Sequence, residues 1–104
     1  MEVATHLILN HFQDENDVII FYFGSRANGK FTRRSDLDVG IWKMDNSHMS
    51  LVKIGLLKEI LEESIVPFGV DLVDFSFASF EFKKKATVEI KIIQGTRSDF
   101  EKMF

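Results

Sequence analysis

The sequence contains no cysteine and only one proline among its 104 residues. Without cysteine it can form neither a disulfide nor a thiolate metal site, so its stability must rest on the packing of apolar side chains. It also lacks an apolar run near the roughly 20 residues that cross a bilayer, and it starts without the basic and apolar blocks of a secretion signal. We therefore expect a cytoplasmic protein with no membrane-spanning segment.

An excess of positive charge is also missing. The formal net charge is −3 and the isoelectric point is near 5.5, whereas a general nucleic-acid-binding protein needs a basic face. We interpret the basic run Lys83–Lys85 as a solvated helix face. For Arg33 and Arg34, a solvated loop and contact with a triphosphate both remain open.

No stretch rich in glycine, proline or serine divides the chain, so we expect a single domain over residues 1–104. The apolar periodicity predicts helices and strands in alternation. The expected elements are a helix over 2–13, strands over 18–23 and 36–42, a helix over 51–64, a strand over 70–75, and a last helix from a cap at Ser79 to Ile93. This order predicts an α/β (α+β) fold with a small mixed β-sheet flanked by helices.

The last of these helices includes residues that also suit a strand. Apolar residues recur at helical spacing up to Ile93, and Gly95 is a natural helix end. However, Val88, Ile90 and Ile92 are β-branched, so intrinsic propensity favours helix and strand about equally in this segment.

The most informative stretch lies between Gly24 and Asp38. The wholly apolar run Val18–Phe23 predicts a strand buried on both faces. Gly24 has no Cβ, so backbone amides and the Ser25 hydroxyl can approach an anionic group such as a phosphate. Asp36 and Asp38 are two apart in an extended segment and must point the same way, which suits a divalent cation such as Mg2+.

Several polar residues near this stretch and in the later strand also need a role. Asp71 stands among apolar residues in an expected strand and needs a partner, whereas Asp74 has the opposite parity and should face away in a structural role. Ser35 is expected to orient Asp36 or to close the turn, and Arg26 to contact phosphate or an acidic partner. The histidines His6, His11 and His48 show no spacing typical of a zinc site.

The motif resembles that of a known family. Gly24-Ser25, Ala27, Gly29 and Ser35-Asp36-Leu37-Asp38 resemble the G-S-x-A-x-G…S-D-x-D signature of the DNA polymerase β-like nucleotidyltransferases, in particular the small minimal nucleotidyltransferases (MNT). Val70–Asp74 and Ile93–Gly95 resemble later segments of the same family. The resemblance covers most of the chain, from Val18 to about Gly95, and implies the palm fold of DNA polymerase β.

The resemblance also implies roles for individual residues. Asp36, Asp38 and Asp71 would hold two Mg2+ ions, and Asp71 would also accept the proton of the attacking hydroxyl. The nucleotide-binding residues would be Gly24, Ser25, Arg26 and Ser35, with ATP as the substrate.

The resemblance also implies an adenylyltransferase that acts with a partner. Stand-alone MNT proteins are often encoded beside HEPN proteins, which are helical ribonuclease toxins, so the resemblance implies an antitoxin that binds and adenylylates its toxin. The alternatives are a non-catalytic antitoxin that neutralises its partner by contact, or an enzyme that modifies a small molecule such as an aminoglycoside. A homo- or hetero-oligomer is left open.

The C-terminal third is unusually rich in large apolar residues. Phe75, Phe77, Phe80 and Phe82 are followed by Phe100, Met103 and Phe104. A core of this size cannot easily enclose them all, so we expect an exposed patch that binds a partner and to which the tail contributes. The alternative is a tail that folds back over the sheet.

Overall fold

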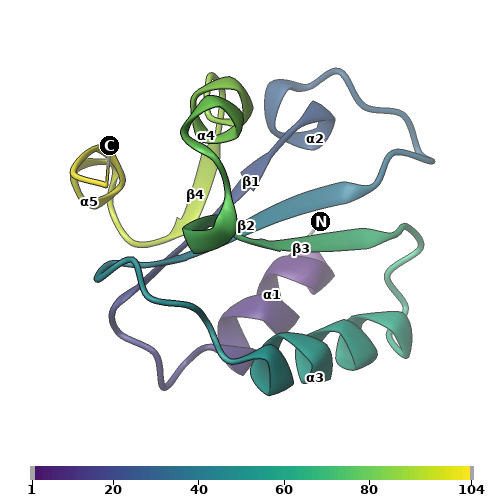
Figure 1. Ribbon diagram of the computed structural model, residues 1–104. Helices are drawn as coiled ribbons and strands as arrows, with labels where there is room; N and C mark the ends of the chain where they lie inside the picture. The colour runs from purple at the N-terminus through teal and green to yellow at the C-terminus, as the bar shows by residue number, and fades with distance from the viewer. Residues whose placement is uncertain (1, 104) are drawn as a thin grey trace.

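The computed structural model describes residues 2–103 and has the predicted mixed sheet flanked by helices (Figure 1). No helix within these residues is both long and apolar enough to pass through a membrane. The elements in chain order are α1 Glu2–His11, β1 Val18–Phe23, α2 Ser25–Asn28, β2 Leu37–Lys43, α3 Leu51–Glu62, β3 Val70–Asp74, the 3-10 helix η1 Phe75–Phe77, α4 Phe80–Ala86, β4 Lys91–Gln94 and α5 Arg97–Glu101.

The four strands form one sheet in the order β3-β2-β1-β4. Strand β1 pairs antiparallel with β2 and β4, and β2 pairs parallel with β3. All six residues of β1 are buried, as the apolar run predicts, because Ile20 and Tyr22 face one layer of helices while Ile19 and Phe21 face the other.

Helices α1 and α3 cover one face of the sheet (Figure 1). Ala4, Ile8 and Phe12 recur four residues apart along and just past α1, so they form a single stripe toward β1 and β2. Helix α3 starts at the Ser50 cap, whose hydroxyl accepts a hydrogen bond from the Lys53 amide.

The opposite face carries an aromatic core. The Phe21 ring makes edge contacts with Phe75 and Phe100, with ring centroids 4.7 and 5.2 Å apart. Phe100 belongs to α5 and is only 4% exposed, and Met103 packs beside this core. The prediction that Phe100 and Met103 form an exposed interface is therefore wrong, because the chain folds back over the sheet; Phe104 lies outside the described residues.

The predicted last helix is also wrong beyond its first two turns. Helix α4 ends at Ala86, and residues 91–94 form β4 against β1. Ile92 packs into the aromatic core and Ile93 into the core below α1, an alternation that only a strand produces. Gly95, at φ 95°, ends this strand and leads into the Thr96 capping box of α5.

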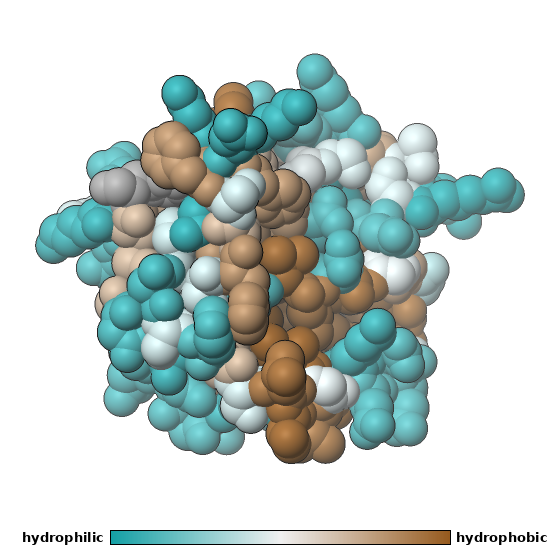
Figure 2. Space-filling model, viewed as in Figure 1, coloured by the Kyte–Doolittle hydropathy of each residue, from teal (hydrophilic) through white to brown (hydrophobic). Residues whose placement is uncertain are grey.

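Apolar side chains remain exposed on α3, η1 and α4, among other elements (Figure 2). Leu51 and Val52 of α3 are 77% and 73% exposed, and Phe77 and Phe80 are 62% and 66% exposed. The Phe-rich segment therefore divides, because Phe75 enters the core while its neighbours stay at the surface.

Candidate active site

Three carboxylates come together where β2 and β3 lie side by side. In the parallel register Leu37 pairs with Val70 and Asp38 with Asp71. Leu37 and Val70 pack below the sheet among α1 and α3, so Asp38 and Asp71 both point to the other face. Asp36 lies directly before β2, outside the paired residues, so the grouping of all three carboxylates in one metal site stays a prediction.

Two glycines make room for these carboxylates. A Cβ on Gly24 would lie 2.2 Å from Oδ2 of Asp38, and a Cβ on Gly69 would lie 2.6 Å from Oδ1 of Asp36. Gly24 also has φ 73°, a conformation that other residues adopt only with strain. The turn after β1 therefore places bare backbone directly against a carboxylate.

The electrostatics of the site favour a cation. Burial raises the pKa of Asp38, and the negative charges of Asp71 and Asp36 raise this pKa further. Carboxylate oxygens are hard donors of the kind that Mg2+ prefers. Within residues 2–103 no three acidic or histidine side chains stand close enough together to hold a metal ion.

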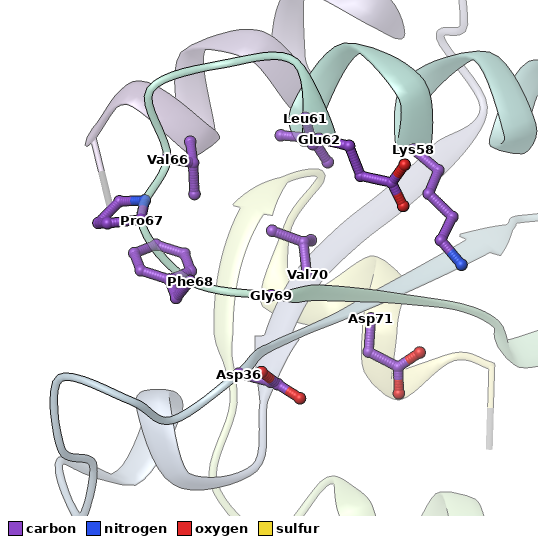
Figure 3. Close-up of a pocket in the computed structure, with 10 residues that line it drawn as sticks. All are labelled: Asp36, Lys58, Leu61, Glu62, Val66, Pro67, Phe68, Gly69, Val70 and Asp71. Atoms are coloured by element: carbon purple, nitrogen blue, oxygen red, sulfur yellow. The ribbon is translucent and has the colours of Figure 1, made fainter.

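The carboxylates are divided between two clefts. The first, about 560 Å³, wraps the edge strand β3: Figure 3 shows Lys58 and Glu62 extending from α3, while Asp36 and Asp71 point away on the other side of β3. The second cleft lies between β1, α2 and α4 and measures about 330 Å³. Its lining residues are Phe23, Gly24, Asn28, Asp38, Phe82, Lys85, Ala86, Val88 and Glu89.

The predicted nucleotide-binding residues other than Gly24 lie in the connection between β1 and β2. Ser25 is the first residue of α2 and is partly exposed. Arg26 is buried: its Nε donates to the Ser35 carbonyl at 2.9 Å, and its guanidinium lies 4.0 Å from the centre of the Phe68 ring. The Ser35 hydroxyl accepts from the Thr32 amide at 3.0 Å. Arg26 and Ser35 thus hold the connection together, and their contact with a nucleotide stays a prediction.

The loop arginines lie apart from the acidic group. Arg33 and Arg34 are exposed and line a further cleft with Arg26 and Phe68, and none of the three carboxylates lines it. Contact of Arg33 and Arg34 with a triphosphate therefore stays open.

Asp74 has the structural role that its parity predicts. Its Oδ2 accepts from the Met49 amide at 2.8 Å, and its Oδ1 accepts from the Ser76 amide at 3.0 Å. The histidines do not approach the acidic site: the His48 ring stacks on Phe77 with centroids 3.7 Å apart, and a ring nitrogen of His11 bonds the Lys53 carbonyl.

The three lysines of the basic run differ in their surroundings: Lys83 lies 4.6 Å above the Trp42 ring, whereas Lys84 and Lys85 are exposed. Lys85 is exposed, as the interpretation of the basic run as a solvated helix face predicts, but the sequence interpretation does not anticipate that it also lines the cleft beside Gly24 and Asp38. The signal was the helical spacing of Phe82 and Lys85, three residues apart and therefore on one face.

A mixed sheet with paired acidic strands beside a glycine turn defines the class of nucleotidyltransferases. The chain belongs to the family described as polymerase beta, nucleotidyltransferase, whose model matches residues 7–99. The family resemblance and the fold expected from it are therefore confirmed.

Similar proteins are known at both sequence and structure level. A probable protein adenylyltransferase MntA of Haemophilus influenzae is 33% identical over 86 residues, which cover 83% of this chain and 74% of that protein. A toxin-antitoxin crystal structure with AMP-PNP has a chain with 27% identity and a TM-score of 0.72, covering 93% of this chain and 77% of that one. A complex of a tri-AMPylated Shewanella oneidensis HEPN toxin with an MNT antitoxin, at 22% identity and a TM-score of 0.67, shares the fold over 96% of this chain and 76% of that one.

Proposed function

We propose that this protein transfers AMP from Mg-ATP to a hydroxyl group on a HEPN-family toxin, and so acts as the antitoxin of that partner. The observation that carries the proposal is the register that sets Asp38 beside Asp71, with Asp36 on the same face and Gly24 against Asp38. The likeness to a probable protein adenylyltransferase supports AMP as the transferred group and a protein as the acceptor.

The reaction forms a bond between the acceptor oxygen and the α-phosphorus of ATP and breaks the bond to the leaving pyrophosphate. Asp36, Asp38 and Asp71 would hold Mg2+, which when bound neutralises the phosphates and lowers the pKa of the attacking hydroxyl. Asp71 accepts the proton of that hydroxyl. The backbone at Gly24 and the Ser25 hydroxyl hold the β- and γ-phosphates, because no side chain obstructs their approach.

The loop between β1 and β2 supports the nucleotide site. Arg26 and Ser35 act on the nucleotide through the loop that they hold together, next to Ser25. Residues 1–104 act as one catalytic domain, and the dependence on ATP supports a cytoplasmic location.

Intact mass spectrometry of a co-expressed HEPN partner tests the proposal. The partner should gain mass in whole AMP units with the parent protein, and none with the Asp36→Asn, Asp38→Asn double variant. Asp45→Asn, an exposed acid outside the site, is the matched control and should transfer normally. A partner left unmodified by the parent protein in the presence of Mg-ATP would refute the proposed reaction.

Neutralisation by contact alone is the second candidate, and the exposed apolar side chains of α3 and η1 favour a binding surface. Growth rescue separates the two. If the double variant relieves toxicity as well as the parent does while adding no AMP, contact rather than transfer delivers the biological effect.

A further inference from the structure

The cleft between β1, α2 and α4 combines an aromatic wall with a cation. Gly24 and Asp38 lie on one side of it, and Phe82, Lys85 and Val88 come from α4 and the turn that follows. The cleft is therefore bounded by Asp38 of the acidic group, by Asn28 of α2 and by α4.

Phe82 is supported on one side and open on the other. Its ring contacts Phe23 edge-on at 6.2 Å and Phe75 at 5.8 Å, both members of the aromatic core, while 44% of the residue remains exposed. An aromatic ring held this way offers an apolar surface to a planar base or to a sugar.

Lys85 is the cation among the described residues that line this cleft. Lys83 is engaged over the Trp42 ring. Asp38 and Glu89 are the acidic residues of the cleft, so an anionic ligand needs both Lys85 and the metal that Asp38 would share.

We propose that this cleft seats the nucleotide, with Phe82 against the base and Lys85 beside the phosphates, so that the α-phosphate reaches Asp38. The inference rests on the proposed function and assigns that site its substrate-binding residues. The cleft at the β3 edge, lined by Asp36 and Asp71, is then left to the acceptor hydroxyl.

Calorimetric binding of Mg-ATP and of Mg-tripolyphosphate to the full chain tests this assignment. Lys85→Met should weaken both ligands about tenfold, because the charge-assisted contact to phosphate is lost. Phe82→Ala should weaken Mg-ATP about tenfold and leave Mg-tripolyphosphate unchanged, because the tripolyphosphate has no base to stack. Lys85→Arg should restore most of the affinity.

Neighbouring residues supply the controls. Lys84→Met and Phe80→Ala change the same residue types on α4 outside the cleft and should bind both ligands as the parent does. Phe82→Leu keeps the apolar packing but removes the ring, so it guards against a simple loss of folding.

The outcomes separate the inference from the function it rests on. The inference alone would be overturned if Lys85→Met bound both ligands as well as Lys84→Met does. It would also be overturned if Phe82→Ala and Phe82→Leu bound Mg-ATP as the parent does. An equal loss of tripolyphosphate in the Phe82 variants would also overturn it. A parent protein that binds no Mg-ATP would overturn both the inference and the proposed function.

Discussion

At the scale of single residues, Gly24 meets two requirements at once. Its φ of 73° excludes an unstrained side chain, and the Asp38 carboxylate occupies the place of the missing Cβ. Gly29 has a similar φ of 79° but nothing within 4 Å of its Cβ position. Comparing substitutions at Gly24 and Gly29 therefore separates the effect of backbone strain from the effect of displacing the Asp38 carboxylate.

We expect Gly24→Ala to abolish the stabilisation that Mg-ATP gives the parent protein, because the new methyl group pushes the Asp38 carboxylate away. Both Gly24→Ala and Gly29→Ala should lose about 1–2 kcal/mol of stability through strain at positive φ. Thermal melting with and without Mg-ATP measures both effects. Equal ligand-induced shifts in the two variants would show that the Gly24–Asp38 contact is not needed for binding.

A second residue-scale prediction concerns pH. Because burial and two neighbouring carboxylates raise the pKa of folded Asp38 above its ordinary 3.8, the folded state holds this proton more tightly than the unfolded chain does. The free energy of unfolding due to this group therefore falls as pH rises from 3.8 through the raised pKa. Without metal, Asp38→Asn should be more stable than the parent at pH 7.

The measurement is the difference in unfolding free energy between parent and Asp38→Asn, taken from urea titrations over a range of pH. This difference should shrink as pH falls through the raised pKa toward 3.8, because the parent then regains its proton. A difference that is constant with pH would mean that the pKa of Asp38 is not raised in the folded protein. Adding Mg2+ and ATP should reverse the order, since only the parent binds them well.

At the scale of elements, the aromatic layer limits what β2 can carry. Gly40 pairs with Phe21 on the neighbouring strand, and a Cβ on Gly40 would lie 2.3 Å from the tip of the Phe21 ring. The ring lies across the bare backbone of β2, which lets it reach Phe75 and Phe100.

We therefore expect Gly40→Ala to destabilise the protein by about 1–3 kcal/mol through overpacking of a closely filled core. Gly55, in the middle of α3 with open space at its Cβ position, is the matched control. Gly55→Ala should stabilise by about 0.5–1 kcal/mol, because alanine favours the helix. Urea denaturation measures both, and a neutral Gly40→Ala would contradict the packing of Phe21.

At the scale of the whole molecule, the helices form two layers around a sheet whose central strand is fully buried (Figure 1). Helix α5 closes the aromatic core, whereas the neighbouring Phe77 and Phe80 remain at the surface. The Phe-rich region thus serves two purposes, and single substitutions can distinguish them.

Phe100→Ala should cost about 3–5 kcal/mol of stability, because it empties a buried site between Phe21 and Trp42. Phe80→Ala should change stability by less than about 0.5 kcal/mol, because the residue lies largely in solvent. If the exposed surface binds the partner, Phe80→Ala should weaken that complex. Urea titration and a pull-down of the co-expressed partner measure the two effects, and a stable Phe100→Ala protein would contradict the closure of the core by α5.

Local chemistry in the sequence was enough to predict which strands carry the acidic residues and which faces these residues share. A wholly apolar run fixes β1 as a central strand, and alternation along a strand fixes the common face of Asp36 and Asp38 and the opposite face of Asp74. These features depend on neighbours one or two residues away, so they survive in any tertiary arrangement. The family signature, which consists of such local patterns, could be recognised for the same reason.

Only the tertiary structure decided the fate of the C-terminal third. Residues 91–94 form a strand because the exposed edge of β1 offers hydrogen bonds and two apolar layers to Ile92 and Ile93, a gain that no local propensity reports. The same long-range packing buries Arg26 against Phe68, draws Phe100 into the core and places Lys85 beside Gly24. Each of these contacts joins segments far apart in the chain. Whether it forms therefore depends on which surfaces meet in the folded protein, and not on the local sequence alone.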